Sequence, residues 1–259
     1  MRGKSFKVRI LIFAVIAAFA FLRKCSQEEV NPYTGKTQAI SLSPDEEIAI
    51  GLQSAPSMAQ QHGGLHHRSD YQTLVDNVGN KLVNSSIATK TPYKYEFHLL
   101  ADAQTINAFA LPGGQIFITY ALFSQLQNED QLAGVLGHEI GHVLGKHSNE
   151  RITNANFWKT FAMGSSAIDM SGVVQQMGQG LLLKNGRGDE LESDKLGVYF
   201  MMDAGYNPEE MIGVMEILKT AAGPNHAPEF QSSHPDPENR IENIKETIRN
   251  YKNKKRLKV

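Results

Sequence analysis

The feature that most constrains this chain is the run HEIGH at residues 138–142, set inside an apolar stretch at 132–144. On an α-helix, residues four positions apart share one face, so His138 and His142 can direct two imidazoles to one point. Neutral imidazoles suit Zn²⁺, and Glu139 can act as general base toward an attacking water. The spacing therefore predicts one Zn²⁺ per chain, provided that a third ligand lies on another ordered element.

The residues before the motif indicate that it lies on a helix. Asn128 can cap the start of that helix, and Glu129 and Asp130 follow at its positive end. The apolar pattern then continues to about Lys146. A solvated surface helix that carries two histidines and a glutamate is the alternative, and the capped, amphipathic pattern disfavours it.

A candidate third ligand lies in an acidic segment that opens a second predicted helix. Glu190 and Asp194 are four residues apart and share a face, so one carboxylate can bind the metal while the other orients a histidine ligand. A charged first turn, favoured by the helix dipole, is the alternative. Cys25 is the one cysteine, which excludes thiolate zinc sites of the Cys₂His₂ type. Histidine and carboxylate must then supply the ligands.

Periodicity along the chain predicts a mostly helical α+β fold, with a small β-sheet beside the motif helix. Helices are expected over 43–61, 69–84, 128–146, 148–183, 189–204, 208–222 and 236–251, and strands over 95–100, 108–111 and 115–119. Pro112-Gly113-Gly114 predicts a tight hairpin turn between the last two strands. The Gly- and Met-rich part, 163–180, is either a mobile segment near the site or a loosely packed core helix. Three histidines in the loop 62–67 are expected to be solvated.

The N-terminal segment is typical of exported proteins. Basic residues precede an apolar run at 10–22, which is shorter than the roughly 20 residues that a spanning helix prefers. Residues 1–24 are therefore expected to be a cleaved signal peptide or an uncleaved signal anchor, with lipidation at Cys25 as a third alternative. Each of these places the protein in the periplasm or cell envelope. A cytosolic protein with an apolar N-terminal helix is the remaining alternative.

The rest of the chain is expected to form one domain. Residues 25–42 are predicted to be a linker with a turn, 43–252 the metal-binding domain, and 253–259 a basic tail. A net charge of −1 and a pI near 6.8 argue against a nucleic-acid partner. A membrane is a partner only through the N-terminal segment, if that segment stays attached. The oligomeric state stays open.

Several motifs occur in an order that resembles one known family. They are HEIGH at 138–142, ELESDKLG at 190–197, NAFALPGG at 107–114, AGYNP at 204–208, and Ser233-His234-Pro235 with Arg240. The chain resembles the zinc metallopeptidase family with HExxH and ExxxD motifs, which includes CAAX prenyl endopeptidases, HtpX membrane proteases, mitochondrial Oma-type proteases, and periplasmic BepA- and LoiP-type proteins. The resemblance extends from about residue 31 to residue 248.

This resemblance implies a gluzincin-like metallopeptidase domain, with Glu190 as third zinc ligand and Asp194 as its partner or as an aid to proton transfer. It also places His234 near the metal. There His234 is a candidate donor to the developing oxyanion. The alternatives are that His234 binds zinc in a resting state or packs on the last helix. Relatives often have Ser-Arg before the acidic motif, whereas this chain has Gly186-Arg187, so the role of Arg187 stays open.

The strand at 107–111 precedes the motif helix, where relatives expose a sheet edge. A substrate strand can pair there through main-chain hydrogen bonds, which makes Asn107 and Ala108 the expected substrate-binding residues. Alternatively the strand is interior, with Phe109 and Leu111 in the core, and both interpretations can hold together.

Taken together, these features predict an exported zinc-dependent metalloendopeptidase that acts on proteins, tethered to a membrane if the N-terminal segment is retained. The resemblance implies damaged or misassembled envelope proteins as substrates. The alternative is a chaperone-like or binding module whose zinc site is latent, plugged by residues 163–180 and His234. A membrane-embedded CAAX-type protease is excluded, because one apolar segment cannot build an intramembrane chamber.

Overall fold

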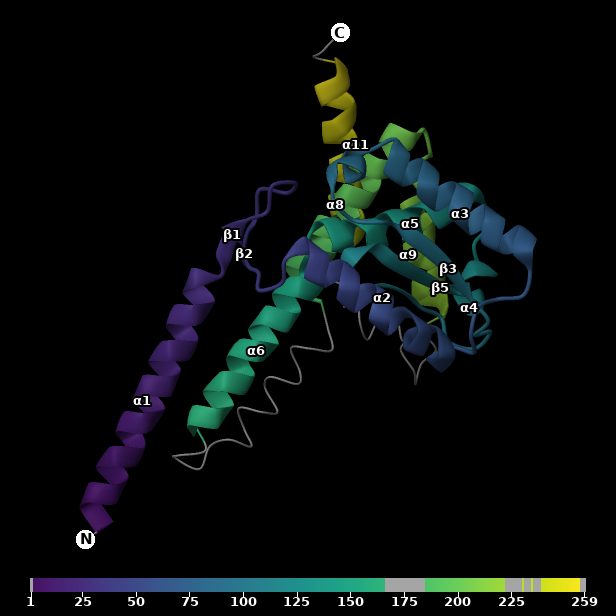
Figure 1. Cartoon of the computed structure of the whole chain (residues 1–259). Coiled ribbons are helices and arrows are strands. Elements are labelled where there is room, and N and C mark those ends of the chain that lie inside the picture. Colours follow the sequence, from purple (N-terminus) through teal and green to yellow (C-terminus); the bar gives the residue numbers. More distant parts are fainter. Residues whose placement is uncertain (1, 166–184, 222–229, 231–233, 235–238, 257–259) are drawn as a thin grey trace. The chain divides into compact units, whose positions relative to one another are not determined.

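The computed structural model describes residues 2–165, 185–221, 230, 234 and 239–256 (Figure 1). The chain divides into two compact units. We call residues 1–42 with 146–185 the arm unit, and 43–145 with 186–259 the core unit. Most of the Gly- and Met-rich segment at 163–180 lies outside the described residues, so neither interpretation of it is tested.

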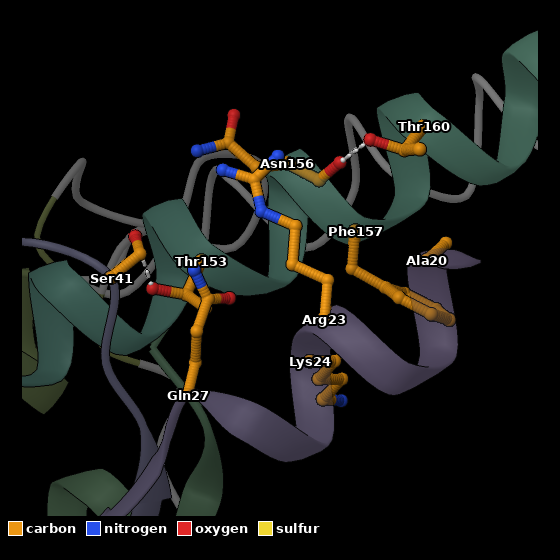
Figure 2. A pocket seen from close by; sticks show the side chains of 9 residues that line it. All are labelled: Ala20, Arg23, Lys24, Gln27, Ser41, Thr153, Asn156, Phe157 and Thr160. Carbon is orange, nitrogen blue, oxygen red and sulfur yellow. Dashed lines mark hydrogen bonds between the residues drawn. The ribbon is translucent and has the colours of Figure 1, made fainter.

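The arm unit consists of two long helices and a small hairpin. Helix α1 spans Arg2–Ser26 and helix α6 spans His147–Ser165. The two helices pack through an edge-to-face contact of Phe13 with Phe161, with ring centroids 5.4 Å apart, and through Lys24, whose Nζ lies 5.2 Å from the ring centroid of Phe157. Ala20 between these contacts is 3% exposed. Figure 2 shows a small pocket between the C-terminal end of α1 and the middle of α6.

The predicted linker at 25–42 carries a hairpin that the sequence did not indicate. Strands β1 (Glu28–Val30) and β2 (Thr37–Ala39) pair antiparallel. Asn31 makes the turn, because its Oδ1 accepts hydrogen bonds from the amides of Tyr33 at 2.9 Å and Thr34 at 3.3 Å.

Among the described helices, α1 included, none has the length and apolarity to cross a membrane.

The core unit contains most of the predicted helices and one short helix, at 120–123, that the sequence did not predict. They are α2 (Pro44–Gln61), α3 (Ser69–Asn84), α4 (Tyr120–Phe123), α5 (Glu129–Leu144), α8 (Arg187–Ala204), α9 (Glu210–Ala221) and α11 (Arg240–Arg256), with short 3₁₀ turns η1 (Ile87–Lys90) and η2 (Pro112–Gly114). The cap predicted at Asn128 is confirmed, because its side chain accepts from the amide of Gln131 at 2.9 Å. Helix α11 runs on into the predicted basic tail.

A three-stranded sheet completes the core unit, so the predicted mostly helical α+β fold is confirmed. Its strands are β3 (Glu96–Leu100), β4 (Ala108–Ala110) and β5 (Gln115–Thr119), in the order β3-β5-β4. Strand β3 is parallel to β5, whereas β4 is antiparallel to β5 and lies at the edge. The predicted turn is present, with Gly113 at a φ of 80° that favours glycine.

Helix α5 lies at the centre of the core unit, and all its residues from Gln131 to Leu144 are buried. Helices α3, α8 and α9 all pack against it. The contact with α8 is close because glycines face one another: a Cβ on Gly137 would lie 3.3 Å from the Cα of Gly197. The motif is thus held on a rigid, water-excluded element.

Candidate metal centre

Helices α5 and α8 bring the three predicted metal ligands together. The Nε2 atoms of His138 and His142 are 3.0 Å apart. Glu190 on α8 faces both rings, with Oε2 3.4 Å from Nε2 of His138 and Oε1 3.4 Å from Nε2 of His142. His234 joins them, with Nδ1 3.2 Å from Oε1 of Glu190. One candidate ligand atom from each of the four residues lies within 4.8 Å of the others.

The chemistry of this cluster fits a divalent cation. Every member is buried, with Glu190 0% and His142, the most exposed, 5% exposed. Two ring nitrogens that face each other at 3.0 Å can share only one proton. In the described part of the chain, Oε2 of Glu190 has no hydrogen-bond partner. Buried polar atoms without such partners are costly, and a nitrogen and oxygen donor set of this kind matches zinc.

The protonation state of each side chain in the cluster depends on the charges of its neighbours. Burial alone would lower the pKa of His138, but the carboxylates of Asp194 and Glu190 close to its two ring nitrogens raise that pKa to about 9. Burial would raise the pKa of Glu190, yet the neighbouring imidazoles of His234 and His138 outweigh it and lower that pKa. The Glu190 carboxylate is therefore ionised. His138 holds a proton, which a metal ion that binds to this ring must displace.

Glu139 lies beside the cluster and outside its ligand set. It is 1% exposed, and neither carboxylate oxygen has a hydrogen-bond partner among the described residues. Its Oε1 lies 3.7 Å from Nε2 of His234. Burial is the largest influence on Glu139 and raises its pKa. A carboxylate with a raised pKa and free lone pairs is suited to accept a proton.

Asp194 lies behind the cluster and contacts a residue whose role the sequence did not predict. Its Oδ1 is 2.9 Å from Nδ1 of His138. Arg240, the first residue of α11, donates to the same carboxylate. Arg240 belongs to one of the sequence motifs, but the sequence assigns it no role. No spacing rule connects the first residue of one helix with a carboxylate on another.

The predicted substrate residues lie at the edge of the sheet. Asn107 directly precedes β4, and Asn107 and Ala108 are 4% and 0% exposed. Phe109 stacks on Phe117 at 4.9 Å between ring centroids, so the strand also contributes to the interior. The exposed fraction of the whole Ala108 residue is zero, so its main chain is buried together with its side chain in this structure.

The prediction that the histidines at 62–67 are solvated is wrong for His62, which is 9% exposed. Its Nδ1 lies 3.1 Å from Oδ2 of Asp102, and His66 stacks on Tyr120 with ring centroids 4.6 Å apart. These rings pack against residues far away in the sequence, which a loop composition does not reveal. Arg187, the first residue of α8, is exposed.

Comparison with known proteins gives consistent matches. The family model described as Peptidase family M48 matches residues 70–248. The chain is 28% identical over 244 residues to the mitochondrial metalloendopeptidase OMA1 of Schizosaccharomyces pombe, across 92% of this chain and 71% of that protein. It is 28% identical over 229 residues to the beta-barrel assembly-enhancing protease of Yersinia pestis, across 83% of this chain. It is 30% identical over 182 residues to the protein of that name in Escherichia coli K12, across 64% of this chain. The aligned parts cover 46% and 37% of these last two proteins.

Proposed function

From the premise that this chain belongs to peptidase family M48, we propose that it is a zinc-dependent metalloendopeptidase that hydrolyses peptide bonds in proteins. The observation that carries the proposal is the convergence of two histidines from α5 and one glutamate from α8 in a buried cluster, with a second glutamate beside it. A zinc hydrolase requires such a set of three ligands and a general base.

We assign the roles at the centre as follows. His138, His142 and Glu190 would hold the zinc, which when bound polarises the scissile carbonyl and makes water a better nucleophile. Glu139 takes the proton of the attacking water and passes it to the leaving amine. Asp194 holds the ring of His138 through Nδ1.

His234 has two proposed roles that differ in their consequences. As a donor, it stabilises the developing oxyanion of the substrate. As a resting-state ligand, it occupies a position that the substrate or water needs. Its ring lies among the other ligands, with Nδ1 3.3 Å from Nε2 of His138. As a resting-state ligand the ring must leave the cluster before turnover, whereas as a donor it must stay close enough to reach the substrate oxygen.

The substrate segment is proposed to lie along β4. An extended peptide can add to this edge through main-chain hydrogen bonds at Ala108, which gives affinity with little demand on sequence. Asn107 would contact the substrate with its side chain. Strand β4 pairs with β5 alone among the described strands, and because Ala108 is buried, a substrate can pair with its other side only after the residues that cover it move.

The biological setting is a proposal that rests on the N-terminal segment and on the relatives. One group of relatives bears the name beta-barrel assembly-enhancing protease, and the other is called mitochondrial. Export through residues 1–24 would place this protein in the periplasm or cell envelope, with envelope proteins as substrates. Measurement of the mature N-terminal mass tests whether the segment is removed, retained or lipidated at Cys25.

Comparison of the wild type with Glu139→Gln tests the proposed activity. Both proteins should bind one zinc ion, but only the wild type should cleave an unfolded protein substrate. Glu246→Gln on the exposed side of α11 is the matched control and should cleave like the wild type. Equal and negligible cleavage by all three proteins, with tight binding of the unfolded substrate, would favour the chaperone-like alternative.

A further inference from the structure

The guanidinium of Arg240 is buried behind the metal cluster and holds one carboxylate with two hydrogen bonds. Its Nε lies 2.5 Å from Oδ2 of Asp194, and its Nη2 lies 2.8 Å from Oδ1. Arg240 is 4% exposed and Asp194 is 2% exposed. A two-point contact between buried charged groups fixes the plane of the carboxylate as well as its charge.

That carboxylate controls which nitrogen of His138 carries the proton. Oδ1 of Asp194 lies 2.9 Å from Nδ1 of His138, and Nη2 of Arg240 lies 3.3 Å from the same nitrogen. Arginine can only donate a hydrogen bond, whereas an ionised carboxylate can only accept one. In the neutral ring, which is the form that binds a metal, Asp194 held in place accepts from Nδ1–H, and the lone pair of Nε2 faces the cluster. A displaced Asp194 would let Arg240 donate to Nδ1, and the proton would then stand on Nε2, where it blocks a metal ion.

We propose that Arg240 is a positioning residue for the metal centre, which acts through Asp194 to present Nε2 of His138 to the ion. This inference rests on the proposed zinc site and extends it by a residue from a third helix. Arg240 also approaches a ligand directly, with Nη2 3.6 Å from Oε2 of Glu190. One side chain at the start of α11 thus contacts both ligand-bearing helices of the centre.

Zinc affinity, measured by competition with a chromophoric chelator on the full chain, tests the proposal without any substrate. Arg240→Gln and Asp194→Asn should each raise the Kd for zinc by about 10- to 100-fold. The double variant should bind zinc about as weakly as the weaker single variant, because both changes break the same chain of contacts. Arg249→Lys, an exposed arginine on the same helix, should bind like the wild type.

A charge-conserving variant separates positioning from a merely structural role. Arg240→Lys keeps the positive charge but loses the planar fork, so its Kd should also rise while its fold is retained. Nitrogen-15 NMR of the imidazoles in metal-free protein, recorded at a pH high enough that the His138 ring keeps a single proton, should show that proton on Nδ1 in the wild type and distributed over both nitrogens in Arg240→Lys. If Arg240→Gln does not fold, the lysine variant still decides the question.

Three outcomes would overturn the inference: wild-type zinc affinity in folded Arg240→Gln or Arg240→Lys, additive losses in the double variant, or an unchanged tautomer of His138 in Arg240→Lys. Failure of the proposed protease activity would look different. In that case zinc would bind with the expected ranking of variants, and cleavage would be absent from the wild type.

Discussion

Gly141 on α5 lies against the backbone of Ser193 on α8, so close that a Cβ at position 141 would stand 2.9 Å from the Ser193 carbonyl oxygen and 3.0 Å from its Cα. Each residue directly precedes a residue of the metal centre, His142 on one helix and Asp194 on the other. The separation of the two helices, and with it the distance between their functional groups, therefore depends on the absence of a side chain at 141.

The substitution Gly141→Ala should weaken both the fold and the zinc site. Real Cβ atoms do not approach backbone this closely, so α8 must move away from α5. Overpacking of this kind costs about 1–3 kcal/mol in free energy of unfolding, which urea denaturation measures. The Kd for zinc should rise in parallel, because Glu190 moves with α8.

Gly188→Ala is the control for that substitution. Gly188 is an exposed residue of α8, and a Cβ there would meet nothing within 4 Å. Alanine should leave stability unchanged or raise it by up to about 1 kcal/mol, through its better helix propensity. If Gly141→Ala matched this control in stability and zinc affinity, the contact with Ser193 would not determine the helix separation.

His234→Ala distinguishes the two proposed roles of that residue by the sign of the change in activity. We expect kcat to fall by about 10²-fold, as after the loss of an oxyanion donor, with one zinc ion still bound by the three remaining ligands. Steady-state cleavage of a peptide substrate, with metal content measured on the same sample, provides the test. A rise in activity would instead identify the ring as a resting-state ligand.

Removal of the metal should destabilise the protein in a ligand-dependent way. An ion that binds only the folded state adds to its stability, so a chelator should lower Tm and added zinc should restore it. His138→Ala should abolish most of this zinc-dependent shift in Tm. Glu139→Gln should retain it, because Glu139 is assigned as a base and does not hold the ion. Loss of the shift in Glu139→Gln would contradict that assignment.

Asp102 should make stability dependent on pH in the acid range. Burial opposes its charge, but hydrogen bonds from Thr105, Gln104 and His62 hold the pKa of this carboxyl well below its usual range. A depressed folded-state pKa stabilises the fold above the unfolded value of about 3.9, and this stability is lost as pH falls toward the folded value. The stability difference between wild type and Asp102→Asn should thus be constant above about pH 5 and shrink below pH 4. Urea midpoints across this range provide the measurement, and a difference that grows on acidification would argue against it.

Local sequence signals predicted the elements that are built from local contacts. The Asn128 cap, the four-residue spacing within HEIGH and the turn at Gly113 each depend on neighbours within one or two turns. Contacts between distant residues left no such signal. His62 pairs with Asp102 and Asp194 with Arg240, and each pair is separated by some forty residues. Spacing rules cannot detect such partners, because the fold alone brings them together.

The predicted linker shows a further reason for the difference. Strands of three residues are too short to display an alternating pattern, so the sequence predicts a turn within 25–42 but not the strands β1 and β2 on either side of it.

The short edge strand β4 has a consequence for the kind of protein that this site can attack. Three residues of main chain can pair only with a segment that has already left its own secondary structure. On the proposed function, a target protein is therefore cleaved at a rate that reflects how often it opens locally, more than which side chains it presents. Well-folded neighbouring proteins would resist cleavage because they rarely open. A partly unfolded protein would be cleaved preferentially because its segments are already extended.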